Sequence, residues 1–188
     1  MRKVIAAINM TLDGVFDHTA GLADEKILLH YTELLGQGDF ILYGRKTYQL
    51  MEYWRTLLEH PSDEKSKNDF AIAIDKIPKI VFSHTLKEVE WITARLSVQT
   101  IEEEVLALKQ QSGKDILVGS RSLIIQLMNL NLIDEYQLCV HSVVAGSGLA
   151  LFENITDRTI LKLIKTKTIS GNGVTLYYEP TNEKMTNR

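Results

Sequence analysis

Short apolar runs alternate with amphipathic segments along most of the chain. Residues 4–10, 40–43, 79–83 and 115–118 are apolar nearly throughout, which is typical of strands that are buried on both faces of a sheet. A helix is predicted for residues 24–35, with the apolar positions on one face: Ile27, Leu28, Tyr31, Leu34 and Leu35. Because this helix stands between the first two apolar runs, we expect those runs to pair in parallel through a right-handed crossover.

The rest of the chain predicts further helices and a change of topology at the end. Helices are predicted from Pro61 to Asp75, from a capping box of Thr100 and Glu103 to Gln111, and from Ser122 with an apolar face of Leu123, Leu127 and Leu130. Further strands are predicted for residues 91–96, 136–144, 159–169 and 174–179, and Asn172-Gly173 is a strong hairpin signal between the last two. The expected fold is α/β, a mixed and mostly parallel sheet with helices on both faces and a C-terminal antiparallel hairpin. We expect one domain over residues 1–180 and a loose tail over residues 181–188.

Composition and charge exclude several classes of protein for this chain. The chain has 188 residues, and its formal net charge of −3 gives no reason to expect nucleic acid or an anionic membrane as a partner. A single cysteine, Cys139, excludes an internal disulfide and fits a reducing cytoplasm. Asn9, Thr11 and Asp13 interrupt the N-terminal apolar run, so we interpret it as a strand and not as a signal peptide. No stretch is long and apolar enough to span a bilayer.

Two predicted strands end in residues suited to binding an anion. Gly44, Arg45, Lys46 and Thr47 follow the second strand and open a short helix. Cations are unfavourable at a helix start unless an anion lies there, so this turn indicates a phosphate site. A solvated basic turn is the alternative. Gly119-Ser120-Arg121-Ser122 follows another buried strand in the same way, and backbone N–H groups at such a turn can also meet an anion.

Other residues with possible chemistry have simpler interpretations. Tyr53 and Trp54 are either core aromatics or the wall of a site for a flat ligand. His18 and His30 are isolated, and we interpret them as surface or helix-face histidines. Cys139 lies in a predicted buried strand, where packing is the expected role. No Ser-His-Asp order and no metal-ligand spacing stands out.

Several motifs in order resemble the dihydrofolate reductase-like fold, in particular the C-terminal reductase domain of the bifunctional riboflavin-biosynthesis deaminase-reductase. The motifs that carry the resemblance are Thr11-Leu12-Asp13-Gly14-Val15, Leu42-Tyr43-Gly44-Arg45-Lys46-Thr47-Tyr48, Ile116-Leu117-Val118-Gly119-Ser120, Leu132-Ile133-Asp134-Glu135-Tyr136 and His141-Ser142-Val143-Val144-Ala145-Gly146-Ser147-Gly148. They cover Lys3 to about Glu179.

The resemblance implies an NADPH-dependent reductase, with the cofactor across the carboxyl ends of the central strands. The pyrimidine reduction of riboflavin biosynthesis, that of 5-amino-6-(5-phosphoribosylamino)uracil, is the best-known precedent, so a small heterocyclic or ribosyl-linked substrate and a homodimer are expected. The cofactor-binding residues that the resemblance implies are Ala7, Gly44, Arg45, Lys46, Thr47, Ser83, His84, Gly119, Ser120, Arg121 and Ser122. Among them, Arg45 offers a planar fork for the 2′-phosphate, and Lys46 and Thr47 face the pyrophosphate.

Three departures leave alternatives open. Many relatives have a second glycine at Ser120 and a proline at His141. Dihydrofolate reductases hold the pterin with a carboxylate on the first helix, whereas we interpret Asp24 and Glu25 as helix N-terminal charges. The chain also lacks the Cys-His set of a zinc deaminase. No proton donor is assigned, and a non-catalytic nucleotide-binding or regulatory module on the same fold is the alternative function. A flavodoxin-like domain is a weaker alternative, against which the Asn172-Gly173 hairpin argues.

Overall fold

A computed structural model describes residues 1–16 and 24–181. Within these ranges the strands are β1 (Val4–Thr11), β2 (Gly38–Gly44), β3 (Lys79–Phe82), β4 (Ala94–Leu96), β5 (Asp115–Val118), β6 (Glu135–His141), β7 (Leu161–Ser170) and β8 (Gly173–Pro180). The helices are α1 (Glu25–Leu35), α2 (Arg45–Met51), α3 (Tyr53–Glu59), α4 (Lys65–Lys76), α5 (Ile101–Gln110) and α6 (Arg121–Asn129).

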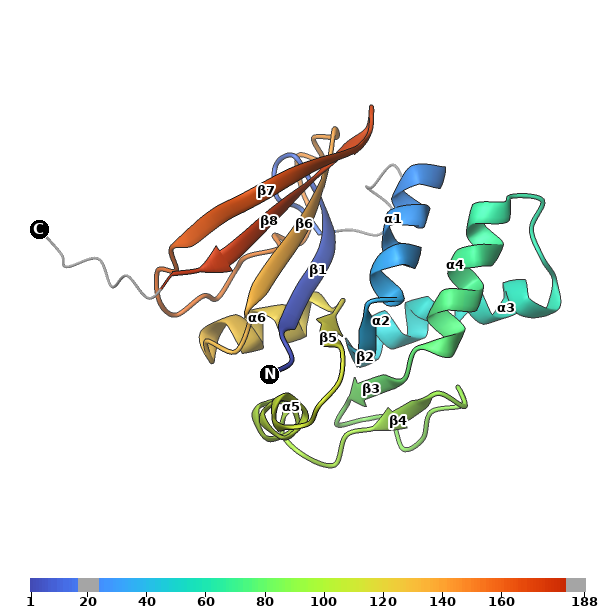
Figure 1. The fold of residues 1–188 in the computed structure, drawn as a ribbon, viewed down its shortest axis with the longest axis horizontal. Coiled ribbons are helices and arrows are strands. Elements are labelled where there is room, and N and C mark those ends of the chain that lie inside the picture. Colours follow the sequence, from blue (N-terminus) through green and yellow to red (C-terminus); the bar gives the residue numbers. More distant parts are fainter. Residues whose placement is uncertain (17–23, 182–188) are drawn as a thin grey trace, which may run out of the picture.

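The strands of the described residues form a single mixed sheet, in the order β4-β3-β2-β5-β1-β6-β8-β7. The neighbours from β4 to β6 all pair in parallel, and β8 pairs antiparallel with both β6 and β7. The β7–β8 hairpin therefore closes one end of the sheet (Figure 1). The predicted fold class, a mostly parallel mixed sheet with a C-terminal antiparallel hairpin, is confirmed.

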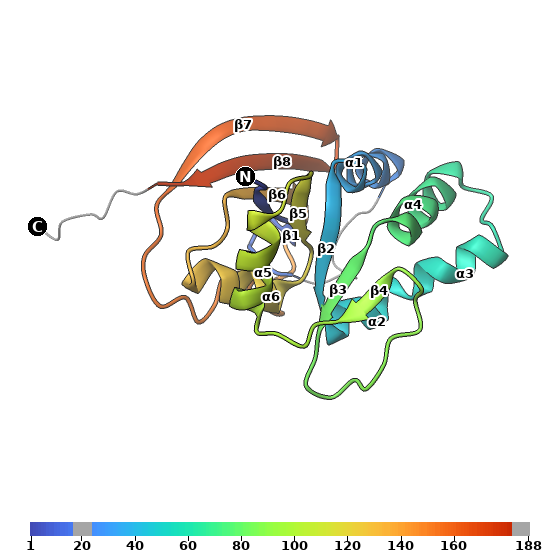
Figure 2. The same ribbon diagram turned by 60° about the horizontal axis from the view of Figure 1, so that its bottom comes forward.

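Helices cover both faces of the sheet, and β1 supplies side chains to each. Val4, Ala6 and Ile8 pack with the buried faces of α5 and α6. Ile5 and Ala7 point the opposite way and pack with α1 and α4. This alternation follows from the two-residue period of a strand and explains why β1 is apolar in almost every position. Figure 2 shows α5 beside α6, with α1 and α4 together on the other side of β2.

The structure confirms the predicted helix cap, the predicted hairpin turn and the predicted burial of Cys139. Thr100 caps α5 in a reciprocal capping box with Glu103. The β7–β8 hairpin turns just before Gly173, as the Asn-Gly pair predicted. Cys139 is buried in β6, as predicted.

The predicted ends of one strand and one helix, and one residue of a predicted apolar helix face, were wrong. The strand predicted for residues 136–144 ends at His141, because the chain then leaves the sheet toward the β1 turn, where Val143 O accepts a hydrogen bond from Leu12 N. The helix predicted from Pro61 begins only at Lys65. Leu130 is 38% exposed, since it lies past the end of α6.

The carboxyl ends of the parallel strands meet at one edge of the sheet, which is where open α/β sheets bind ligands. Both predicted strand-to-helix turns lie there, after β2 and after β5. In the described ranges no helix is long and apolar enough to cross a membrane. Most of the tail predicted to be loose lies outside the described residues.

Candidate functional site

A polar groove and an apolar pocket adjoin at the carboxyl edge of the sheet. The groove has a volume of about 770 Å³, and the pocket has a volume of about 260 Å³. Phe16 and Thr47 line both, so the two spaces meet at these residues. Volumes of this order are typical of sites for small molecules and cofactors.

The polar groove collects positive charge. Arg45, Lys46 and Arg121 line it, and no lining residue in the described part of the chain is acidic. Hydroxyl groups supply most of the remaining polarity of its lining, from Thr47, Ser83, Ser97, Thr100, Ser120 and Ser122. A cationic concavity in a chain of net charge −3 is suited to an anionic ligand.

Arg45 and Lys46 are not neutralised by neighbouring carboxylates. The only hydrogen bond of the Arg45 side chain to a described residue is from Nη1 to Gln49 Oε1, at 3.3 Å. Neither cation forms an ion pair within residues 1–16 and 24–181, and Lys46 is exposed. Both charges therefore remain available to a ligand in the groove.

Arg121 has a different environment from the one that the sequence implied. Its Nε donates a hydrogen bond of 2.6 Å to Ala150 O, and its Nη2 forms an ion pair with Glu153. The side chain thus holds the segment that follows β6 against the start of α6. This neutralisation makes Arg121 a weaker ligand for an anion than Arg45 or Lys46.

Ser120 joins the two strand-to-helix turns that form the groove floor. Its Oγ accepts a hydrogen bond of 3.0 Å from Gly44 N and lies 2.6 Å from Thr47 Oγ1. A Cβ at Gly44 would lie only 3.1 Å from Ser122 Oγ and 3.3 Å from Ser120 Oγ, so a glycine is needed for this close approach. Ser120 therefore fastens the end of β2 to the turn after β5.

Ser83 and His84 lie at the end of β3, on the other side of the groove. Ser83 Oγ accepts hydrogen bonds from Thr85 N and Leu86 N, at 3.1 and 2.9 Å, so it also shapes its own turn. His84 is exposed. The structure thus brings Gly44, Arg45, Lys46, Thr47, Ser83, His84, Ser120, Arg121 and Ser122 together around one groove.

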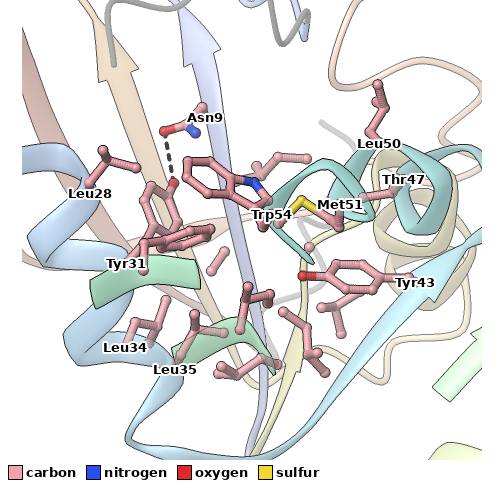
Figure 3. Close-up of a pocket in the computed structure, with 18 of the residues that line it drawn as sticks. Asn9, Leu28, Tyr31, Leu34, Leu35, Tyr43, Thr47, Leu50, Met51 and Trp54 are labelled. Carbon is pink, nitrogen blue, oxygen red and sulfur yellow. Dashed lines mark hydrogen bonds between the residues drawn. The ribbon is translucent and has the colours of Figure 1, made fainter. Parts of the chain in front are cut away.

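Ala7 and Gly119, the remaining residues implied as cofactor ligands, line the apolar pocket instead of the groove. This pocket lies between α1, α2, α3, α4 and the sheet (Figure 3). Trp54 forms one wall and meets the Phe70 ring edge-on, with centroids 4.5 Å apart. Trp54 thus lines a cavity, as one of the two interpretations expected, whereas Tyr53 is exposed.

A small polar network lies at one end of the pocket. The Tyr31 hydroxyl donates a hydrogen bond of 2.9 Å to Asn9 Oδ1, which is also 3.0 Å from His141 Nε2 (Figure 3). Burial raises the pKa of Tyr31 well above its usual value, so this hydroxyl stays protonated. Asn9 and Tyr31 were missed as site residues, because a polar residue in an apolar strand and a tyrosine on a helix face carry no distinctive motif.

Carboxylates near the site have structural roles. Asp24 caps α1 by accepting a hydrogen bond of 3.0 Å from Ile27 N, as its interpretation as a helix charge predicted. Asp13 accepts hydrogen bonds from Thr11 Oγ1, Ala145 N and Gly146 N, which lower its pKa to about 2. These contacts tie the turn after β1 to the segment after β6.

Histidine 30 was interpreted as a surface or helix-face residue, but it is only 6% exposed. Its Nε2 lies 3.5 Å from Thr175 Oγ1 on β8, because α1 packs across the hairpin end of the sheet. Burial lowers its pKa and favours the neutral ring. His18 lies outside the described residues. Within those residues, no group of histidine, cysteine and acidic side chains is arranged to hold a metal ion.

Comparisons with known proteins agree on one family. The model of the RibD C-terminal domain matches residues 2–176. The Bacillus subtilis (strain 168) protein YyaP is 35% identical over 181 residues, which cover 94% of each chain. A pyrimidine reductase-like protein from Corynebacterium diphtheriae superposes with a TM-score of 0.66 at 12% identity, over 97% of this chain and 93% of that one. The diaminohydroxyphosphoribosylaminopyrimidine deaminase/5-amino-6-(5-phosphoribosylamino)uracil reductase of Thermotoga maritima superposes with a TM-score of 0.63 at 15% identity, over 96% of this chain and 57% of that one.

Proposed function

Because this chain belongs to the RibD C-terminal domain family, we propose that it is a reductase that transfers hydride from NADPH to a small molecule. The observation that carries the proposal is a polar groove beside an uncharged apolar pocket, where Arg45 and Lys46 have no carboxylate partner among the residues that the structure describes. A reductase of this kind needs one site for an anionic cofactor and an adjoining site that excludes water from the reacting carbon.

The residues of the groove fit the phosphates of a dinucleotide. Arg45 presents a guanidinium for the 2′-phosphate, and Lys46, Thr47 and Ser122 present a cation and hydroxyls for the pyrophosphate. At Gly44 the absence of a side chain lets the Ser120 and Ser122 hydroxyls approach the groove floor. When bound, NADPH supplies the hydride, and the protein's part is to orient it toward the apolar pocket.

Thr47 occupies a position between the two spaces. It lines both of them, and its hydroxyl is fixed by the 2.6 Å contact with Ser120 Oγ. Gly119 and Ala7 lie on the pocket side of the same junction. We therefore place the nicotinamide end of the cofactor at this junction in the proposal, with the adenosine end toward Ser83 and His84.

NADPH binding tests the proposal directly. We expect cofactor fluorescence titrations to give micromolar affinity for NADPH and weaker binding of NADH. The Arg45→Ala variant should lose roughly 10-fold in NADPH affinity, the order expected for one charged hydrogen-bond partner. It should lose less for NADH, which has no 2′-phosphate.

Arg55→Ala is the matched control. Arg55 carries the same charge on α3 but does not line the groove, so this variant should bind NADPH like the wild type. Binding of neither nucleotide by the wild type would refute the proposed function.

A non-catalytic nucleotide-binding module is the second candidate, and one observation favours it. Within the described residues no carboxylate lines the apolar pocket, so the acid that dihydrofolate reductases use has no counterpart there. NADPH oxidation in the presence of substrates distinguishes the two candidates: binding without turnover of any compound that occupies the pocket would favour the module.

A further inference from the structure

The apolar pocket has an unusual chemical character for a site that would take a sugar phosphate. None of its described lining residues is charged, and the lining is dominated by aliphatic and aromatic side chains from four helices and the sheet. Burial of a phosphate without a cation partner is strongly unfavourable. The pocket is therefore suited to an uncharged and largely apolar molecule.

Among the described lining residues, Tyr43 places in this pocket a hydroxyl that forms no hydrogen bond with the protein. Its side chain is 2% exposed, and Figure 3 shows its oxygen pointing into the space enclosed by the apolar side chains. The hydroxyl forms no hydrogen bond with a described residue and is not fully buried. By contrast, the hydroxyls of Tyr31 and Thr47 are occupied by Asn9 and Ser120.

The Tyr43 ring is held in place, so the direction of its hydroxyl is set by packing. A Cβ at Gly119 would lie 3.1 Å from Tyr43 Cε1, which shows how closely the ring lies on the end of β5. Burial raises the pKa of Tyr43 far above its usual value, so the group remains a neutral O–H donor throughout the working range of pH. The Tyr43 oxygen is not among the fully buried unpartnered atoms of the described residues, so it reaches the open space of the pocket, where an acceptor atom of a ligand can take its hydrogen bond.

We propose that the pocket binds an uncharged, largely apolar carbonyl compound, and that the Tyr43 hydroxyl donates a hydrogen bond to its carbonyl oxygen. This inference rests on the proposed function for its redox partner and adds the substrate class and a catalytic residue. It differs from the ribosyl-linked substrate that the family resemblance implied, because the described pocket offers no cation for a phosphate and few groups for sugar hydroxyls.

The reaction balances with NADPH as the reductant. Hydride forms a new C–H bond at the carbonyl carbon, and the π pair of the C=O bond moves to oxygen. That oxygen takes the proton of the Tyr43 hydroxyl, which regains one from solvent, so the products are an alcohol and NADP⁺. The hydrogen bond from Tyr43 stabilises the negative charge that develops on oxygen, in a pocket from which water is excluded.

The test measures binding of a probe without cofactor. We would use 2-acetylnaphthalene and record the infrared carbonyl band of the bound probe, with its affinity from a fluorescence titration. In the wild type the band should lie at lower frequency than in Tyr43→Phe, and Tyr43→Phe should bind the probe roughly 2- to 12-fold more weakly, the net effect of one neutral hydrogen bond. The hydrocarbon 2-ethylnaphthalene should bind both proteins equally.

Tyr136→Phe is the matched control, since Tyr136 is a buried tyrosine of the opposite core cluster and does not line the pocket. It should leave both the band and the affinity unchanged. An identical carbonyl band in wild type and Tyr43→Phe, or displacement of the probe by ribose 5-phosphate at equal concentration, would overturn the inference.

The two proposals fail separately. If NADPH does not bind but the carbonyl band shifts with Tyr43, the proposed function fails and the pocket assignment stands. If NADPH binds and the band does not shift, the assignment of Tyr43 and of the carbonyl substrate fails alone.

Discussion

Ser120 is the residue whose removal tests how the groove is built. Its Oγ accepts the buried N–H of Gly44 at 3.0 Å and contacts Thr47 Oγ1 at 2.6 Å, and the side chain is 1% exposed. The Ser120→Ala substitution removes the oxygen but leaves a methyl group of similar size. We therefore expect lost hydrogen bonds without a large cavity.

The magnitude follows from the groups that lose a partner. A buried N–H left unpaired costs about 1–3 kcal/mol, and the neutral bond to Thr47 contributes about 1 kcal/mol. The two effects share one oxygen, so we expect a total loss of about 2–3 kcal/mol in the free energy of unfolding. For a typical domain this is a large part of a total of about 5–15 kcal/mol.

Urea unfolding of the wild type and Ser120→Ala gives this difference, provided that the denaturant slope is the same for both proteins. Ser122→Ala is the matched control, because Ser122 is exposed and its Oγ donates no hydrogen bond to a described residue. It should change stability by less than about 0.5 kcal/mol. Amide hydrogen exchange at Gly44 should accelerate in Ser120→Ala only.

The reasoning would be refuted if Ser120→Ala were as stable as Ser122→Ala and the exchange of the Gly44 N–H did not change. That result would mean that Gly44 finds another acceptor, so that Ser120 does not fasten the two turns.

Three further predictions concern single groups. Burial lowers the pKa of Lys79 from 10.5 to about 7, so the unfolded chain binds more protons than the folded protein between these pH values. The free energy of unfolding should therefore rise from pH 7 to pH 10, and Lys79→Met should flatten the urea-midpoint profile. Hydrogen bonds to Asp13 lower its pKa from 3.8 to about 2, so its contribution to folding stability is present above pH 3.8 and is lost as the pH falls through about 2. At neutral pH, Asp13→Asn should speed amide exchange at Gly146, and unchanged exchange would contradict this role. Tyr43→Phe should be about as stable as the wild type by thermal unfolding, because it removes a hydroxyl that forms no hydrogen bond with a described residue. A loss of more than about 1 kcal/mol would show that the hydroxyl is satisfied in the free protein.

Much of the fold could be predicted from the sequence because its signals are local. The apolar runs of the central strands, the face of α1, the Thr100–Glu103 capping box and the Asn172-Gly173 turn depend on residues within a few positions of each other. The ordered motifs then indicated the family, and with it the groove at the end of β2. Nine of the eleven residues implied as cofactor ligands line that groove, although their roles stay a prediction.

Only the tertiary structure decided which side chains are available for chemistry. Arg121 and Arg45 look alike in the sequence, but Glu153, thirty-two positions further along the chain, neutralises Arg121. No described carboxylate pairs with Arg45. The Tyr43 ring lies against Gly119, just after the neighbouring strand β5, and its hydroxyl forms no hydrogen bond with a described residue. The hydrophobic periodicity of the sequence predicts whether a residue is buried, since burial follows the repeat of the helix or strand that contains the residue. The side chain that lies opposite a buried residue is decided by strand order and helix packing, which depend on contacts between distant segments of the chain.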